Sequence, residues 1–181
     1  MFGMTASRRY QLLCPVARSL DVLGDRWSLL VLRDLHAGPA RFHELQSGLG
    51  IATNLLSTRL ADLQSAGLVR RAGDGVRAPY ELTDLGRGTD RVLWELVRFG
   101  GRLDRDPDPR PPGNLRTLAL PLRMMFAGVV HEPDLRTRLL VDDDAFVVHV
   151  TPHGGDVVYG DRATPVDVEL RATYDDLLDA A

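Results

Sequence analysis

Residues 41–83 constrain the fold of this chain most, because two short segments with helically spaced apolar residues are followed by a hairpin pattern. Spacings of i, i+3, i+7 and i, i+4, i+7 each predict one buried stripe on a helix. The stripes are Phe42, Leu45 and Leu49 in the first segment and Leu56, Leu60 and Leu63 in the second. Gly48 and Gly50 are expected to break the first helix, and Gly67 is expected to end the second.

Two short runs typical of β-strands, 68–72 and 79–83, flank the stretch from Gly73 to Arg77. The glycines in that stretch permit a tight hairpin tip, from which Arg77 can project. Helix, turn, helix and hairpin in this order predict a winged helix-turn-helix, a device that reads DNA. Small α+β domains that contact no nucleic acid also carry such patterns, and the pattern alone leaves that alternative open.

The second predicted helix exposes short hydrogen-bonding side chains, which suits a helix lying in the major groove of DNA. Asn54 and Ser57 are expected to read base edges, whereas Arg41 and Arg77 are expected to meet phosphates. Since Ala52 has no capping side chain, Thr53 is expected to cap this helix. The candidate DNA-binding residues are Arg41, Thr53, Asn54, Ser57, Thr58, Arg59, Arg71, Gly75 and Arg77.

An ordered series of short motifs runs through residues 14–101. The motifs are Cys14-Pro15-Val16, Leu23-Gly24-Asp25-Arg26-Trp27, Gly38-Pro39-Ala40-Arg41-Phe42 with Glu44-Leu45, Leu56-Ser57-Thr58-Arg59-Leu60, Gly67-Leu68-Val69 and Tyr80-Glu81-Leu82-Thr83-Asp84-Leu85-Gly86. In order and spacing this series resembles the HxlR-type winged-helix transcription regulators of bacteria. The resemblance implies a cytoplasmic homodimer that binds a pseudo-palindromic operator in double-stranded DNA, as repressor or activator, and answers to a metabolite or to reactive electrophiles. Ala52 departs from the family, which usually has Ser or Thr there.

The net charge of −3 looks unfavourable for a DNA-binding protein, but the charge is unevenly distributed. Residues 1–105 carry 15 Arg and 11 acidic residues, or +4, whereas residues 106–181 carry 7 and 14, or −7. The positive half is the half that contains the predicted winged helix. The charge split therefore favours DNA binding by that half.

The chain is expected to be an α+β protein with two domains. Residues 1–103 form the winged helix-turn-helix and dimerisation domain, and the proline-rich run 104–114 is a linker. Within the first domain a helix is predicted at 15–23, a second begins after the capping residue Asp25, and a third spans 84–100. Residues 115–181 are predicted to form a small α+β unit.

This second unit starts with an apolar helix near Pro121 and continues with short β-rich runs. It is loosely similar to the sterol-carrier-like domains fused behind some HxlR-type regulators, which implies an apolar small-molecule effector held between sheet and helices. The candidate pocket residues are Met124, Met125, Phe126, Phe146, Val148 and Val150. An ordinary packed core is the alternative. If the unit is only a sensor, deletion of residues 110–181 leaves DNA binding intact but unresponsive.

Cys14 is the single cysteine and precedes Pro15 at a predicted helix start. Free N–H groups there stabilise a thiolate, and redox-sensing HxlR-type regulators use the cysteine of this motif. The apolar neighbours favour the alternative, a buried and unreactive thiol. Oxidation would have to produce a bridge between two Cys14 residues of a dimer or a mixed disulfide. Dimerisation is expected through the first and last helices of the first domain, using Leu12, Leu13, Leu93, Trp94 and Val97.

Other classes of function have little support in the sequence. His149, His153 and Asp156 span a strand end and a turn without completing a coordination shell, so neither a metal nor a cofactor is expected. No nucleophile elbow or phosphate-binding loop is present, so an enzyme is not expected. Apolar runs are too short for a membrane span, and a cytoplasmic protein is expected. The runner-up function is a protein-interaction or lipid-carrier protein in which the winged helix is a scaffold.

Overall fold

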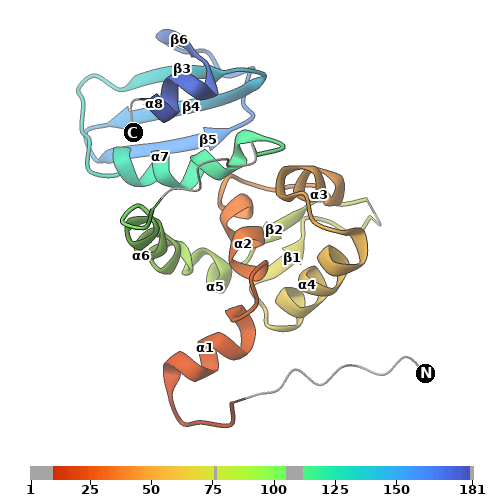
Figure 1. The fold of residues 1–181 in the computed structure, drawn as a ribbon. Coiled ribbons are helices and arrows are strands. Elements are labelled where there is room, and N and C mark those ends of the chain that lie inside the picture. Colours follow the sequence, from red (N-terminus) through yellow and green to blue (C-terminus); the bar gives the residue numbers. More distant parts are fainter. Residues whose placement is uncertain (1–9, 76, 105–111, 180–181) are drawn as a thin grey trace.

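The computed structural model describes residues 10–75, 77–104 and 112–179. Its elements fall into two groups, which Figure 1 shows meeting along α7. The first group contains α1 (Pro15–Leu23), α2 (Ser28–His36), α3 (Phe42–Leu49), α4 (Thr53–Ser65), β1 (Val69–Arg71), β2 (Tyr80–Leu82), α5 (Asp84–Arg87) and α6 (Asp90–Gly100). The second contains η1 (Leu115–Leu118), α7 (Ala119–Phe126), β3 (Leu135–Val141), β4 (Asp144–Thr151), β5 (Gly154–Tyr159), β6 (Val168–Ala172) and α8 (Tyr174–Asp179).

The leucines with helical spacing build the core of the first group. Leu45 of α3 and Leu56, Leu60 and Leu63 of α4 are all at most 1% exposed, and they share one cluster with Leu32 of α2. Full burial of such a side chain stabilises the fold by about 1.5–3 kcal/mol. The stripe predicted from the sequence therefore fixes which side of α4 faces inward and which side faces solvent.

Two glycines lie near the end of α3, but only one of them ends the helix. α3 continues through Gly48 and stops before Gly50, which has a left-handed φ of 61°. The expectation that Gly48 breaks the helix was wrong. Its lack of a side chain instead makes room for Asn114, since a Cβ on Gly48 would lie 2.4 Å from the Asn114 amide nitrogen.

The predicted hairpin is present as β1 and β2, paired antiparallel with Val69 opposite Leu82. The segment before α3 adds a bridge, because Ala40 and Tyr80 exchange two backbone hydrogen bonds of 2.9 and 2.7 Å. Val76, at the tip of the predicted hairpin, lies outside the described residues. Helices α2, α3 and α4 together with this hairpin form a winged helix-turn-helix.

The prediction of one continuous helix over 84–100 was wrong. The structure has two helices there, α5 and α6, which are separated at Gly88 and Thr89. The Thr89 hydroxyl donates to the Gly86 carbonyl at 2.7 Å and lies 3.0 Å from Nε2 of His36. A threonine that binds nearby backbone in this way competes with continuous helix. The helical period continues across the division, which is why spacing alone did not reveal it.

The second group is a four-stranded sheet in the order β5-β4-β3-β6. Strands β3 and β6 are parallel, and the other neighbours are antiparallel. Figure 1 shows α7 lying along one face of the sheet. Phe146, Val148 and Val150 of β4 and Val157 of β5 are buried in one cluster with Ala119 of α7. The strands predicted from the short β-rich runs are thus confirmed.

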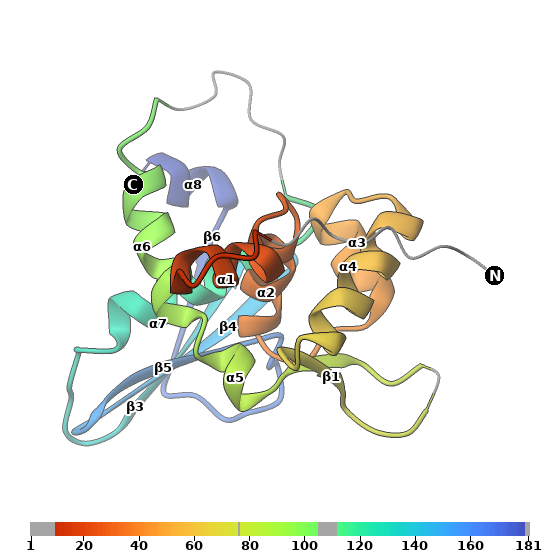
Figure 2. The same ribbon diagram turned by 90° about the horizontal axis from the view of Figure 1, so that it is seen from below.

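Helix α7 is shared by the two groups. Ala119 belongs to the core under the sheet, whereas Leu120, which is 0% exposed, belongs to the core of the winged helix. Figure 2 shows α7 beside α6, which it contacts. The linker predicted at 104–114 falls largely on residues 105–111, which lie outside the described residues.

The candidate pocket residues lie in different surroundings. Met124 packs against the winged-helix core, and Met125 is 64% exposed. Phe126 packs against the core under the sheet, where Phe146, Val148 and Val150 are buried. Of these three neighbours on α7, Phe126 faces the sheet, whereas the helical turn directs the two methionines away from it. Within the described ranges, no helix has the length and apolar character needed to cross a membrane.

Candidate nucleic-acid interface

Helix α4 turns a polar side to solvent because its leucines are used in the core. Thr53, Asn54, Ser57 and Thr58 are all exposed. The Thr58 hydroxyl donates to the Asn54 carbonyl at 2.9 Å, one turn earlier in the same helix. The side chains of Asn54 and Ser57 therefore stand on a regular helix surface with hydrogen-bonding groups of the kind that contact base edges.

The start of α4 differs from the expectation. Ala52 occupies the N-cap position without a side-chain hydrogen bond, and Thr53 is the first helical residue. The predicted capping role of Thr53 was wrong, because its hydroxyl instead accepts a 2.7 Å hydrogen bond from Nε2 of Gln46 in α3. This bond joins the two helices of the helix-turn-helix at the end that faces solvent. Gln46 was not singled out from the sequence.

Arg59, which is expected to contact DNA, is ion-paired within this chain. Its Nη1 lies 2.8 Å from an oxygen of Asp62, and its Nε lies 3.3 Å from Oδ1 of Asp25. The same Asp25 oxygen accepts hydrogen bonds from the N–H groups of Trp27 and Ser28. The N-cap position of α2 is Trp27 rather than Asp25, so Asp25 supports the start of the helix from two residues before its cap. Arg59 therefore ties α4 to the start of α2.

A basic groove lies between the start of α3 and the wing. It has a volume of about 650 Å³ and is lined by Arg41, Phe42, His43, Arg71, Arg77 and Ala78. Arg41, His43 and Arg77 are exposed, and the two arginines are close enough to border one hollow although 36 positions separate them. Arginines gathered around a hollow of this kind suit binding of phosphate groups.

Arg71 supports the wing as well as lining this groove. Its guanidinium donates to the Ala78 carbonyl at 3.0 Å and to the Tyr80 hydroxyl at 2.7 Å, and its Cζ lies 4.3 Å from the centre of the Tyr80 ring. The expectation of a purely DNA-binding Arg71 is thus too simple. Gly73, at the base of the hairpin tip, has a positive φ of 119°, a backbone conformation that favours glycine. Gly75 is exposed at the tip and does not have a positive φ.

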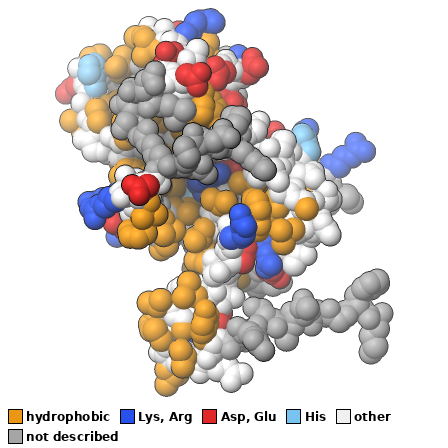
Figure 3. Space-filling view, in the orientation of Figure 1, with side chains coloured by type: hydrophobic (Ala, Val, Ile, Leu, Met, Phe, Trp, Pro, Cys, Tyr) orange, Lys and Arg blue, Asp and Glu red, His pale blue; other side chains and the backbone are white. Residues whose placement is uncertain are grey.

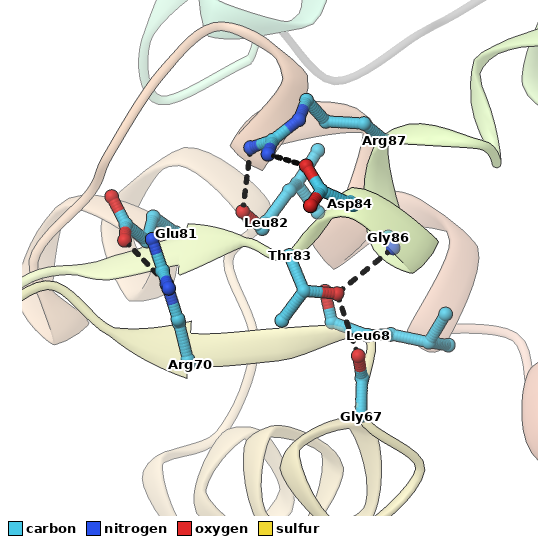
Figure 4. A network of polar contacts seen from close by, with 9 residues as sticks. All are labelled: Gly67, Leu68, Arg70, Glu81, Leu82, Thr83, Asp84, Gly86 and Arg87. Atoms are coloured by element: carbon cyan, nitrogen blue, oxygen red, sulfur yellow. Dashed lines mark hydrogen bonds and ion pairs between the residues drawn. The ribbon is translucent and has the colours of Figure 1, made fainter.

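A polar network holds the wing on the rest of the domain (Figure 4). The Thr83 hydroxyl donates to the Gly67 carbonyl at 2.6 Å and accepts from the Gly86 N–H at 3.1 Å. Arg70 and Glu81, which face each other across the hairpin, form an ion pair of 2.7 Å. The end of α4, both strands and the start of α5 are therefore fixed to one another, which gives the wing a defined position relative to α4.

His36 is a buried titratable group at the end of α2. It is 6% exposed, and both burial and the charge of Arg123 lower its pKa, to about 4. Since the Thr89 hydroxyl donates its own proton to Gly86, it accepts the proton of Nε2. His36 is thus neutral at physiological pH and works as a structural donor between α2 and the α5–α6 division.

Apolar side chains cover the exposed sides of α1 and α6. Only Ala17 of α1 is buried, and Figure 3 shows the apolar side chains gathered over this helix at the lower end of the molecule. The exposed apolar residues of this region are Leu12, Leu13, Val16 and Leu20 near α1 and Val92, Leu96, Val97 and Phe99 on α6. Of the residues predicted for dimerisation, Leu93 is buried and Trp94 half-buried within this chain. We refer to the exposed set as the α1–α6 apolar face.

Cys14 occupies the N-cap position of α1 with Pro15 after it, as predicted. The thiol is exposed in the single chain, so the alternative of a cysteine buried within its own chain was wrong. His149 lies 3.2 Å from Asp134, and no group of three or more metal-ligating side chains occurs among the described residues. Neither His153 nor Asp156 joins this pair.

The fold, the exposed polar side of α4 and the adjoining wing define a winged helix-turn-helix protein. A family profile described as HxlR-like helix-turn-helix matches residues 22–106. The regulator sll1512 of Synechocystis, an uncharacterized HTH-type transcriptional regulator, is 35% identical over 92 residues, which cover 49% of this chain and 68% of that protein. The chain belongs to the HxlR-like helix-turn-helix family.

Two further relatives support the same assignment. Rv3095 of Mycobacterium tuberculosis, also an uncharacterized HTH-type transcriptional regulator, is 38% identical over 104 residues. These cover 56% of this chain and 65% of Rv3095, so the chain spans less than two thirds of that relative. The crystal structure of PA1607, described as a candidate transcription factor, has a TM-score of 0.50 and 41% identity, covering 56% of this chain and 72% of that one.

Proposed function

We propose that this protein is a DNA-binding transcriptional regulator. The observation that carries the proposal is the exposed polar side of α4 beside a groove lined by three arginines. Such a helix suits the major groove, and the arginines suit the flanking phosphates. Its relatives are HTH-type transcriptional regulators, which agrees with this function. A regulator of this kind acts on chromosomal DNA, so we place it in the cytoplasm.

In this proposal Asn54 and Ser57 contact base edges, and Thr53 and Thr58 flank them. Arg41 and Arg77 meet phosphates on the two sides of the groove, with the backbone of Gly75 near the same strand. Arg71 holds the wing and adds positive charge to the groove. Arg59 contributes by fixing α4 rather than by touching DNA, because two carboxylates bind its guanidinium.

The α1–α6 apolar face supports a homodimer. Helix α1 has nine residues, of which only Ala17 is buried, so packing within its own chain stabilises it little. Large exposed apolar areas are typical of protein–protein interfaces. Two-fold symmetry then presents two α4 helices to DNA, so the operator is pseudo-palindromic, with half-sites about 34–36 Å apart or multiples of that distance.

DNA binding is tested by gel shift with fragments flanking the protein's own gene, against unrelated DNA of equal length and composition. The expected result is a complex that survives excess unrelated competitor. Binding of all fragments with one affinity would favour a scaffold or carrier role instead. The measurement is made at two salt concentrations, because phosphate contacts weaken as salt rises.

We further propose that the sheet of residues 135–172 belongs to a sterol-carrier-like sensing domain for an apolar small molecule. The support is the apolar side of β6, where Val168 and Leu170 are 40% and 53% exposed and pair in register with Thr137 and Leu139 of β3. Exposed Met125 on α7 adds to the apolar surface of this group. Saturable binding of a fluorescent fatty acid, lost in Leu170→Arg, is expected; unchanged binding in that variant contradicts this assignment of the site.

Response to oxidants is a separate proposal, supported by the exposed Cys14 thiol next to the α1–α6 apolar face. In a dimer, oxidation by a peroxide gives a sulfenic acid, and the second Cys14 thiolate displaces water to form an intersubunit disulfide. Non-reducing electrophoresis after hydrogen peroxide is expected to show a dimer, and Cys14→Ser is expected to abolish it. If the protein still runs as a monomer after the peroxide has been consumed, Cys14 does not form the intersubunit disulfide and is a structural residue.

A further inference from the structure

Arg116 reaches out of the second group of elements into the winged helix. It lies in η1, immediately before α7, and is 5% exposed. Its guanidinium donates to three backbone carbonyls, that of Asp34 in the last turn of α2 and those of Gly38 and Pro39 in the α2–α3 connection. The Asp34 and Pro39 bonds both measure 3.1 Å. One side chain thus donates hydrogen bonds both to the last turn of α2, where the Asp34 carbonyl also accepts the Ala37 N–H at 3.2 Å, and to the adjoining turn.

The other side of the guanidinium rests on the sheet. Its Cζ lies 4.9 Å from the centre of the Tyr159 ring in β5. The Tyr159 hydroxyl donates to Asp144, and burial raises the pKa of Tyr159, which keeps this donor protonated. The second oxygen of Asp144 accepts the Leu115 N–H at 2.9 Å, next to Arg116 in the chain. The sheet therefore sets where the guanidinium points.

The residues before Arg116 dock on α3 itself. The Asn114 side-chain amide donates to the Glu44 carbonyl at 3.0 Å, and the Gly113 N–H lies 3.3 Å from the Gly48 carbonyl. A Cβ on Gly113 would lie 2.0 Å from the Ser47 carbonyl oxygen, so only glycine permits this approach. Segment 113–116 is consequently packed along the first helix of the helix-turn-helix.

The connection held by Arg116 controls the DNA-facing elements directly. It ends at Ala40, which bridges to Tyr80 of the wing, and Arg41 then begins α3. Gly38 has φ 115°, a conformation that glycine readily adopts and that turns the chain between the two helices. A shift of this turn moves α3 and the wing strand together, and with α3 moves α4 through the Gln46–Thr53 bond.

We infer that Arg116 is a positioning residue for DNA recognition, through which the sheet of residues 135–172 fixes the relative placement of α3, α4 and the wing. This inference rests on the proposed DNA-binding function. It assigns the second group a part in DNA reading that does not require any ligand. A displacement at Tyr159 is transmitted through Arg116 to the turn 37–40, because the guanidinium contacts both.

The test compares Arg116→Met and Arg116→Lys with wild type in the full chain. Arg138→Met is the matched control, since Arg138 is also a largely buried arginine that binds a backbone carbonyl and Glu169, but within the second group alone. Arg116→Met is expected to lower the ratio of specific to nonspecific DNA affinity about tenfold, a typical coupling between sites. Arg116→Lys, which retains one charged donor group, is expected to recover part of the ratio.

Hydrogen exchange provides a readout that loss of general stability would not give. In Arg116→Met, amides of residues 37–49 are expected to exchange faster, while those of β3 and β4 keep their wild-type rates. Arg138→Met should leave both the DNA ratio and the exchange of residues 37–49 unchanged. Tyr159→Leu combined with Arg116→Met should add nothing further to the loss of specificity, because both substitutions break one connection.

The outcomes separate the inference from the proposed function. If wild type binds no DNA selectively, the proposed function fails and the inference fails with it. Suppose that wild type is selective and that folded Arg116→Met keeps the wild-type ratio of specific to nonspecific affinity and the wild-type hydrogen exchange. The inference then fails while the proposed function stands. If Arg116→Met does not fold, the same criterion is applied to Arg116→Lys. A ratio lowered equally by Arg138→Met also overturns it, because the effect is then general destabilisation.

Discussion

Among single residues, the proposed interface has some side chains that are expected to contact bases and others that are expected to contact phosphates. Asn54 and Ser57 are exposed on the first turns of α4, and Arg77 is exposed beside the groove at the wing. Contacts to bases discriminate between sequences, whereas contacts to phosphates do not. The two kinds of residue are therefore expected to give different signatures when replaced.

Asn54→Ala and Ser57→Ala are each expected to weaken binding to the specific operator by about 1–3 kcal/mol, because a base contact is lost. Affinity for unrelated DNA should hardly change. Fluorescence anisotropy with a labelled operator and with a scrambled duplex measures both. Equal weakening on the two duplexes would mean that these side chains do not read bases.

Arg77→Ala is expected to weaken specific and unrelated DNA alike. Each lost phosphate contact lowers the slope of log affinity against log salt by about 0.9, so a dimer that loses two contacts changes by about 2. Arg138→Met, far from the wing, is the charge-matched control. An unchanged salt slope in Arg77→Ala would remove the wing tip from the interface.

His36 gives stability a predictable dependence on pH. Its pKa in the folded chain is about 4, below the ordinary value of 6.5. Between these two pH values the unfolded chain therefore binds a proton at this histidine and the folded chain does not. The contribution of neutral His36 to the free energy of unfolding is complete above pH 6.5. As the pH falls toward 4, this free energy decreases by about 3 kcal/mol. Urea unfolding between pH 7.5 and 4.5 should show this loss in wild type relative to His36→Gln, whose amide can still donate to Thr89. Parallel curves for the two proteins would contradict it.

At the scale of elements, the sequence predicted what local periodicity determines. The leucines of α4 defined its buried side, and the β-rich runs defined the hairpin and the four-stranded sheet. The division between α5 and α6 was missed because Thr89 binds His36, which is 53 positions away. The ion pair of Arg59 was missed for the same reason, since Asp25 lies 34 positions earlier in the chain. Long-range polar partners leave no periodic signal in a sequence.

The α1–α6 apolar face carries a prediction of its own at this scale. Leu20→Glu combined with Leu96→Glu places charges on two side chains that are each 45% exposed in one chain. The monomer should remain folded, while sedimentation velocity shows a shift from dimer to monomer and operator affinity falls by more than tenfold. A wild-type protein that sediments as a monomer at micromolar concentration contradicts the proposed assembly.

At the scale of the whole molecule, the two groups of elements are less separable than the proline-rich run suggested. Leu120 and Met124 of α7 pack in or against the core of the winged helix, and Arg116 and Asn114 bind its backbone. The sequence could show the boundary in composition but not these contacts across it. The expectation that residues 110–181 can be deleted without harm to DNA binding therefore needs revision.

Deletion of residues 110–181 is instead expected to destabilise the winged helix, because it removes the fully buried Leu120 and the hydrogen bonds that Arg116 donates to the carbonyls of Asp34, Gly38 and Pro39. Loss of a buried leucine alone costs about 2–5 kcal/mol. Thermal unfolding followed by circular dichroism should show a lower Tm than in the full chain. A truncated protein with wild-type Tm and wild-type operator affinity would show that the second group is dispensable.

The central claim is that α4 of this chain reads a specific DNA sequence. Selection of bound fragments from a random duplex library, followed by affinity measurement on the winner, tests it most directly. We expect a pseudo-palindromic site bound by one dimer at least about a thousandfold more tightly than unrelated DNA. We also expect Asn54→Ala to select a different or degenerate sequence. Enrichment of no sequence, or the same sequence selected by Asn54→Ala with equal affinity, would contradict the claim.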